Sequence, residues 1–453
     1  MNNTTNVNTQ SPKNVSRSSL VNEYASVVQN DNITLKDAKF ELQDVLHKAI
    51  VNQSGDIKHR ALACYKVPVT SFNRTNEGGV KVEEPIRLTK TDQGAHFSGI
   101  AKCNNSNYCP CCMERILVEK SKILQAIEKA WLSKPNRSIL LVTYTLSHDK
   151  DDCFCDLVDS LKDAKRKMLQ WRAVKELKKS VNYFSSVTAL EATISDINGL
   201  HPHMHDAWYL ESIPTVQEVL DLRDSLCEEW KKALNKKGYD CSFERGVNIS
   251  FSVTSPDGDI INTHTNEPIS PDIKDQKIFS QGSTGQYLSK VAKELTFSFV
   301  KSTKRHENRT LMHVLIDQVM YYTKENEKII YKYVQAMQGR ARIYINPELY
   351  AMEKEYLNEI EFQPDLPFED EPEKALQVTL FEFSHDEWKR VCFNRKRKDI
   401  LLLAALDKPP TQIQRLIREL LDTLPLTLPP PEYKTMMIKR SKESIWSWIG
   451  AAA

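Results

Sequence analysis

The stretch Gly199–Leu210 reads G-L-H-P-H-M-H-D-A-W-Y-L and holds three of the eleven histidines in a chain of 453 residues. Successive side chains of a β-strand point to opposite faces. An extended conformation therefore places His201, His203 and His205 on one face, and Met204 on the other, toward the core. Neutral imidazole is a common ligand of catalytic divalent ions, so the alternation predicts a metal-binding strand rather than a polar strand edge.

Strand geometry distinguishes among the three histidines. Positions two apart on a strand lie about 6.6 Å apart and can share one ion, whereas positions four apart lie about 13 Å apart. Pro202 cannot donate a hydrogen bond to a neighbouring strand, which places it at the start of this one. His203 and His205 are therefore the predicted pair of metal ligands, and His201 is a candidate third ligand at the beginning of the strand.

The segment before the histidines predicts their antiparallel partner. Residues Ser185–Thr193 have the alternation of a strand, and Ser195–Gly199 is rich in residues that favour turns. A connection this short joins antiparallel neighbours, which brings Glu191 near the histidines. Its carboxylate could complete the metal shell or fix the tautomer of an imidazole. The alternative is an ordinary exposed glutamate.

Clustered cysteines predict a second metal site. Cys103, Cys109 and Cys112 have the spacing C-x5-C-x2-C, with Cys111 between the last two and Cys64 upstream. Ten cysteines without an N-terminal apolar segment indicate a reducing cytosol, where such clusters bind metal instead of forming disulfides. A C-x2-C pair can present two thiolates to one tetrahedral ion, and the other two cysteines could complete a structural site for one Zn²⁺. The alternative is a reduced, partly buried cluster.

The histidine stretch resembles the HUH motif of rolling-circle replication initiators, in which two histidines flank a bulky hydrophobic residue. It resembles more closely the plasmid Rep proteins that carry H-P-H-x-H. Other segments between about residues 60 and 350 carry the same resemblance. They are the cysteine segment, the apolar strand Ser138–Ser147 expected beside the histidines, L-E-A-T around Glu191, Y-L-S-K-V-A-K-E from Tyr287, and Q-G-R-A-R ending at Arg342.

This resemblance implies an α+β fold. A central antiparallel sheet, an RRM-like or ferredoxin-like palm, would carry the HUH histidines between flanking helices, preceded by the small cysteine-rich segment. The implied protein is a plasmid rolling-circle replication initiator that nicks one strand at the origin by transesterification with Mg²⁺ or Mn²⁺. Its partners would be origin DNA, single-stranded at the nick, and a host helicase and DNA polymerase. The rival interpretations are an HUH transposase or mobilisation relaxase, and a non-catalytic zinc-containing DNA-binding protein.

The resemblance also assigns roles to residues outside the histidine strand. Tyr287 would be the nucleophile, leaving a 5′-phosphotyrosine and a free 3′-hydroxyl, and Lys290 would stabilise phosphate charge. A helical period supports this pairing, because residues three apart share one face of a helix. Arg340 and Arg342 would contact DNA. Some relatives carry a glutamate four residues before the tyrosine, to activate a terminating water, and others carry a second tyrosine four residues after it. Those positions are Ser283 and Val291 here. The terminating nucleophile would then be Tyr287 of a second protomer in a dimer, or a water activated by a distant carboxylate.

The chain divides into segments of different composition. We expect a disordered tail at 1–32, an N-terminal helix and cysteine-rich segment at 33–135, the HUH endonuclease domain at 136–350, a small helical module at 375–430 and a flexible tail at 431–453. An acidic, proline-rich linker occupies 363–374, a long loop 255–283, and a basic helix 156–180 that is either a solvated face or a DNA contact.

Net charge and hydropathy limit the classes of partner that the chain can bind. The formal net charge is only +2, so a surface for nucleic acid must be local. No apolar stretch approaches the eighteen residues that a membrane-spanning helix requires. The lack of such a stretch predicts no membrane partner, and the resemblance to plasmid Rep proteins implies a protein of the bacterial cytoplasm.

Overall fold

The computed structural model describes residues 35–55, 59–75, 81–83, 85–91, 94–195, 197–255, 258–279, 309–361 and 378–425. Within them the chain forms an α+β fold with antiparallel sheets, as the sequence predicted. The large sheet contains, in spatial order, β10 (Ile343–Ile345), β6 (Tyr183–Ser195), β7 (Gly199–Leu210), β5 (Ser138–Thr145), β8 (Val247–Thr254) and β9 (Ile260–His264). The edge strand β9 lies inside the segment predicted to be a loop.

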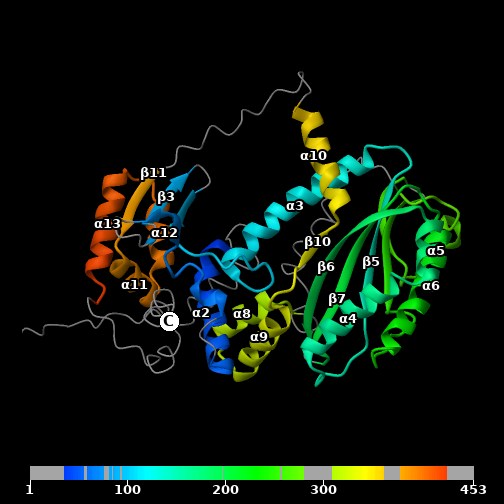
Figure 1. Cartoon of the computed structure of the whole chain (residues 1–453), viewed down its shortest axis with the longest axis horizontal. Coiled ribbons are helices and arrows are strands. Elements are labelled where there is room, and N and C mark those ends of the chain that lie inside the picture. The colour runs from blue at the N-terminus through cyan, green and yellow to red at the C-terminus, as the bar shows by residue number, and fades with distance from the viewer. Residues whose placement is uncertain are drawn as a thin grey trace, which may run out of the picture.

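The histidine strand β7 lies in the middle of this sheet (Figure 1). It forms the predicted hairpin with β6, in which Glu191 pairs with His203. Its other neighbour is β5, where Thr143 pairs with His205, so the strand at Ser138–Thr145 does lie beside the histidines. Gly199 opens β7 with a φ of 70°, a left-handed conformation that costs glycine little.

Helices cover the two faces of the sheet unequally. Apolar side chains at even-numbered positions of β6 and β7, including Met204 and Trp208, belong to the main core, where α4 (Phe154–Met168) packs on β7 and α6 (Val216–Asn235) packs on β8 and α4. The odd-numbered face packs against α3 (Pro110–Leu132) and α10 (Pro347–Glu361) at one end only, through Ala207, Tyr209 and their neighbours. The three histidines and Glu191 occupy the other end of that face. The fold thus keeps a polar area next to a buried core.

A buried ion pair fixes α4 to the sheet. Lys165 is 5% exposed and forms a short ion pair with Asp206 of β7, which is 1% exposed. The same ammonium group donates to the Thr188 hydroxyl at 3.0 Å. Lys165 belongs to the basic run at 156–180, which was expected to face solvent or DNA. Because this lysine is buried against Asp206, it does neither in this structure. That run forms two helices, α4 and α5 (Arg172–Ser180), instead of the single predicted helix.

The N- and C-terminal segments share the small sheet. Its strands, in order, are β11 (Val378–Phe383), β3 (Ile86–Thr91) and β4 (Gly94–Ser98). The Trp388 ring packs on Phe97, and its indole N–H donates to the Lys66 carbonyl at 3.0 Å. The remaining elements of this end are α11 (His385–Phe393), α12 (Arg397–Ala405), α13 (Pro410–Asp422), β1 (Thr70–Thr75) and β2 (Lys81–Glu83).

A small helical group joins the two sheets. It consists of α2 (Leu35–Ser54), α8 (Leu311–Met320) and α9 (Lys324–Met337), which pack on one another. The buried Arg397 of α12 donates to Gln43 and Asp44 of α2, at 2.7 and 3.1 Å. Figure 1 shows this group between the two sheets, with α3 running along it toward the large one. Segments 33–135 and 375–430 therefore pack together, through the shared small sheet and the contact between α12 and α2.

The predicted tails at 1–32 and 431–453 and the linker at 363–374 lie outside the described residues. Within the described residues, every helix is too short or too polar to cross a lipid bilayer.

Candidate functional site

Three side chains converge on the uncovered end of the large sheet. The Oε2 atom of Glu191 lies 3.1 Å from Nε2 of His203 and 3.0 Å from Nε2 of His205. The two imidazole rings are nearly perpendicular, with centroids 4.9 Å apart. One oxygen and two nitrogens therefore lie within 4.8 Å of one another, in a group that could hold a metal ion.

The surroundings of Glu191 keep its carboxylate ionised, which favours binding of a cation. Burial alone raises the pKa of Glu191, but the charge and hydrogen bonds of His203 and His205 outweigh it and hold the pKa well below its usual range. The carboxylate is only 7% exposed. A buried, ionised carboxylate between two imidazoles is stable only with positive charge or donated protons at its oxygen. The donor set of two nitrogens and one oxygen suits a divalent ion.

Thr143 orients one of the imidazoles. Its hydroxyl lies 2.9 Å from Nδ1 of His205. When Nε2 of His205 binds a cation, the ring proton resides on Nδ1 and donates to the threonine oxygen. Thr143 thus stands directly behind the group formed by Glu191, His203 and His205.

His201 does not join that group. Its Nδ1 atom lies 2.9 Å from Nε2 of His148, and the two rings stack with centroids 5.0 Å apart. Burial, followed by the charges of His203 and His148, lowers the pKa of His201 to about 4. The pair lines a cleft of about 550 Å³ together with Asn198 and Arg245. In this structure His201 therefore contacts His148 and lies beside the group formed by Glu191, His203 and His205.

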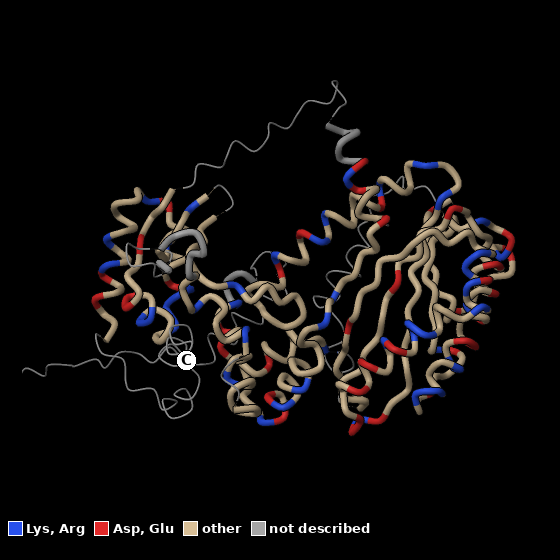
Figure 2. Tube along the Cα trace, viewed as in Figure 1, with Lys and Arg blue, Asp and Glu red and all other residues tan. Residues whose placement is uncertain are grey.

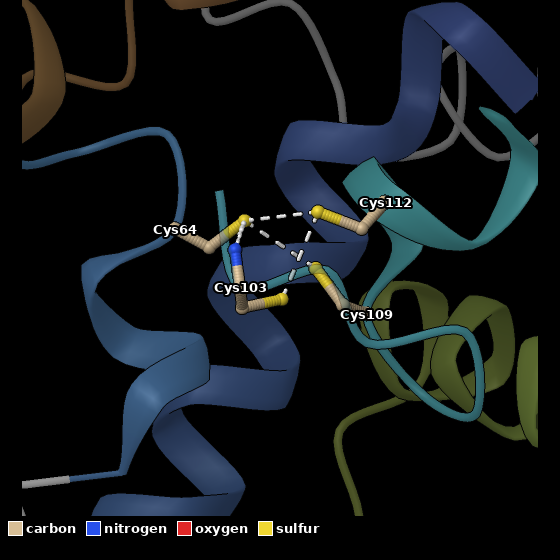
Figure 3. A group of neighbouring side chains, drawn as sticks. All are labelled: Cys64, Cys103, Cys109 and Cys112. Carbon is tan, nitrogen blue, oxygen red and sulfur yellow. Dashed lines mark hydrogen bonds between the residues drawn. The ribbon is translucent and has the colours of Figure 1, made fainter. Parts of the chain in front are cut away.

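The four predicted cysteines meet in a second group (Figure 3). Cys64 follows a short 3-10 helix, Cys103 and Cys109 flank a loop, and Cys112 lies in the first turn of α3. All four are buried, and none forms a disulfide. Hydrogen bonds from Cys103, Cys109 and Cys64 hold the pKa of Cys112 below its usual range.

The spacing of the sulfurs fits a tetrahedral ion. The Sγ atoms of Cys64 and Cys112 lie 3.5 Å apart, and those of Cys103–Cys112 and Cys109–Cys64 lie 3.7 Å apart. A disulfide would need about 2.05 Å. Zinc–sulfur bonds of about 2.3 Å give a tetrahedron with edges of about 3.8 Å. The cluster could therefore hold a zinc ion. Cys111, the competing candidate, points elsewhere and donates to the Lys39 carbonyl at 3.7 Å.

The cysteine loop also touches the segment predicted to contact DNA. Asn107 lies between Cys103 and Cys109 and donates to the carbonyl of Arg340 at 2.6 Å. The Arg340 side chain pairs with Asp159 at 2.6 Å. Arg342 is 4% exposed, and its carbonyl accepts a 2.8 Å hydrogen bond from the Leu190 amide, next to Glu191. In this structure both arginines are engaged with protein groups.

Other predicted residues lie outside the described part of the chain. They are Tyr287 and Lys290, together with the departures from the Rep pattern at Ser283 and Val291.

Sequence patterns did not single out several residues near the histidines. His148 follows β5 and meets His201 only because the end of one strand lies beside the start of the other. Asn248 of β8 pairs with Thr143, and its buried Oδ1 atom has no hydrogen-bond partner among the described residues. The polar types of these residues were the only indication that the sequence offered.

The fold and its two groups define an α+β protein with one candidate histidine–carboxylate centre and one candidate four-cysteine centre. The chain is 25% identical to a protein named rep from Streptomyces lividans, over an alignment of 133 positions that covers 24% of this chain and 29% of that protein. The match thus spans less than a third of the relative's length. No family model and no solved structure gives a significant match.

Proposed function

We propose that this protein is a Rep-type replication initiator of the HUH class, which nicks one strand of a plasmid origin by metal-dependent transesterification. The observation that carries the proposal is the placement of one Glu191 oxygen between Nε2 of His203 and Nε2 of His205. The similarity to the rep protein supports a role in replication independently of this geometry.

The three residues would bind the catalytic ion, for which Mg²⁺ and Mn²⁺ are the candidates. A divalent cation at this position supplies Lewis-acid polarisation of the scissile phosphate. Glu191 contributes the negative charge that holds the cation, and its burial limits competition from water. Thr143 keeps His205 in the tautomer that presents Nε2. His203 lies two register positions nearer the hairpin turn than His205 and opposes Glu191 directly.

Tyr287 is the proposed nucleophile, on sequence grounds. Its phenol oxygen attacks phosphorus and loses its proton. The bond from phosphorus to the 3′ oxygen breaks, and that oxygen gains a proton. The products are a 5′-phosphotyrosine and a 3′-hydroxyl that a polymerase can extend, and the number of phosphoester bonds is unchanged. Lys290 would stabilise the charge on the phosphate oxygens during this exchange.

The four-cysteine cluster would hold a structural Zn²⁺. Burial of all four thiols and the absence of an exposed ligand position at Cys64 and Cys109 favour a structural over a catalytic ion. Through Asn107 the cluster reaches the carbonyl of Arg340, close to the strand that carries Glu191.

A nicking assay tests the proposal. Single-stranded oligonucleotides tiled across the origin of the replicon that encodes this chain are incubated with protein and Mn²⁺. We expect cleavage and a protein–DNA adduct that survives denaturing electrophoresis. Excess chelator, or His203→Ala with His205→Ala, should abolish both while leaving duplex-origin binding largely intact, since phosphate and base contacts made elsewhere provide that binding.

A matched histidine variant controls for damage to the sheet. His264 lies on the edge strand β9 and contacts the Ser250 hydroxyl instead of Glu191. His264→Ala should cleave at close to the wild-type rate. Full activity of the wild-type protein in excess chelator, or equal losses in both histidine variants, would reject a metal centre at Glu191, His203 and His205. DNA binding without any cleavage would support a non-catalytic DNA-binding protein.

A further inference from the structure

A groove with basic walls lies beside the β6–β7 hairpin. Its volume is about 480 Å³. Its lining comes from α9, from the end of the hairpin and from the loop at 150–152. The basic residues that line it are Lys150, Arg309, Lys324, Lys328 and Lys332, and the acidic ones are Asp151, Asp152 and Glu325.

The three lysines of α9 form a regular row. Residues four apart on a helix share a face and are separated by about 6 Å along the axis. Lys324, Lys328 and Lys332 are exposed, and none forms an ion pair with an acidic side chain within the described part of the chain. Acidic and basic residues are interspersed along the rest of the trace (Figure 2).

The acidic side chains of the groove offset part of this charge, because Asp151, Asp152 and Glu325 face five basic residues and leave a formal net charge of about +2. Asp152 caps a turn by accepting a hydrogen bond from the Asp149 amide at 2.9 Å. Arg309 is tied to the hairpin by backbone hydrogen bonds with Ile194 of 2.7 and 2.8 Å. The lysine row therefore supplies three of the five positive charges that line the groove.

Two exposed aromatic rings precede the row. Tyr321 and Tyr322 are 61% and 56% exposed, and they end immediately before Thr323, the N-cap of α9. The Tyr322 hydroxyl donates to Glu327, which holds the phenol oxygen while the ring stays exposed. Aromatic rings next to a row of cations are the features that bind unpaired bases and their phosphates. A duplex offers no free base faces for such stacking.

We infer that this groove binds the single-stranded DNA that flanks the nick, with phosphates on Lys324, Lys328 and Lys332 and a base on Tyr321 or Tyr322. The inference rests on the proposed function for its choice of DNA. The groove is lined by Ile194 and Ser195, three and four residues from Glu191 on β6, which corresponds to about 10–13 Å along a strand. A strand leaving the candidate metal centre would therefore reach the groove within a few nucleotides.

Fluorescence anisotropy with a labelled oligo-dT strand in chelator tests the inference without cleavage. Log affinity is measured against log salt from about 50 to 200 mM for the wild type and for Lys324→Gln/Lys328→Gln/Lys332→Gln. Each phosphate contact on a single strand contributes about 0.7 to the slope, so the triple variant should lose about 2 from it and bind about a hundred-fold more weakly near 0.1 M salt.

The control removes the same charge elsewhere. Lys122, Lys129 and Lys134 are exposed on α3 and just beyond it, and Lys122→Gln/Lys129→Gln/Lys134→Gln should leave slope and affinity close to wild type. Tyr321→Ala/Tyr322→Ala should weaken binding at least about five-fold with an unchanged slope, because stacking involves no counterion. Its effect should disappear on an abasic strand.

Three results would contradict the inference that the groove binds single-stranded DNA. They are an unchanged slope in the α9 variant, an equal loss in the α3 control, and an equal loss on duplex DNA. The outcome is separable from that of the proposed function. If wild-type protein bound oligo-dT through α9 but never nicked origin DNA, the groove would still be a single-strand binding site, and the proposed initiator function would be rejected. Nicking by protein whose α9 variant binds normally would reject only the groove.

Discussion

Replacing Thr143 with valine should weaken the candidate catalytic metal centre without touching any of its ligands. The Thr143 hydroxyl is 2.9 Å from Nδ1 of His205, whose Nε2 faces Glu191. Valine keeps the shape of threonine and favours strands, so β5 should fold as before. It cannot accept a hydrogen bond from the Nδ1–H group of His205. The imidazole then loses the partner that sets its tautomer and orientation.

Two estimates give the size of the effect. Loss of the hydrogen-bonded partner of a metal-binding histidine typically weakens metal affinity by about 10- to 100-fold, which corresponds to about 1.4–2.7 kcal/mol. A buried donor left without an acceptor costs about 1–3 kcal/mol. His205 is 8% exposed, so water replaces the hydroxyl poorly and the upper half of this range applies.

Calorimetric titration of the purified protein with Mn²⁺ measures this affinity directly, independently of nicking. Thr143→Ser retains the hydroxyl and should restore affinity to within a few-fold of wild type. Thr145→Val is the matched control, because the Thr145 hydroxyl donates to the Arg245 carbonyl at 2.7 Å and not to an imidazole. If Thr143→Val bound Mn²⁺ as tightly as Thr145→Val, the orienting role of Thr143 would be refuted.

Three further outcomes follow from the structure. Purified protein should carry about one zinc by native mass spectrometry, and Cys109→Ser/Cys112→Ser should remove it and lower the melting temperature more than it alters cleavage chemistry; zinc-free wild-type protein would contradict this. Lys165→Met should lower the free energy of unfolding in urea by about 3–5 kcal/mol because it leaves Asp206 buried and unpaired, and Lys165→Met/Asp206→Leu should recover most of the loss. If a second protomer's Tyr287 terminates the cycle, wild type diluted with Tyr287→Phe should nick normally but close circles poorly, whereas undiminished closure would indicate water and a carboxylate.

The parts of the site that local sequence could specify were the hairpin and the cysteines. Strand alternation and a turn of a few residues determine which side chains share a face, so Glu191 was expected near His203 and His205. The four cysteines are farther apart in sequence, but their shared chemistry restricts where they can meet. Four cysteines could therefore be grouped by their shared ability to bind one metal ion, although their sequence separation does not show that they lie close together.

Contacts between distant segments could not be anticipated in this way. Residues 378–383 were expected to belong to a small helical module, but they form β11, and nothing in their local sequence indicates β3 as the partner. Likewise, the charge of Lys165 suggested a solvated or DNA-binding face, whereas its partner Asp206 lies on another element. His201 was a candidate ligand by alternation, and His148 engages it through the packing of β5 against β7. Which lysines of α9 line a groove likewise depends on the β6–β7 hairpin.

Mapping the covalent adduct tests the central claim most directly. Wild-type protein is incubated with single-stranded origin DNA and Mn²⁺, digested with trypsin and nuclease, and analysed by mass spectrometry for a peptide carrying a 5′-linked nucleotide. We expect the nucleotide on Tyr287, and its complete loss in Tyr287→Phe, in chelator and in Glu191→Gln. A nucleotide on another residue, or no adduct from metal-loaded wild-type protein on its own origin, would contradict the proposed chemistry.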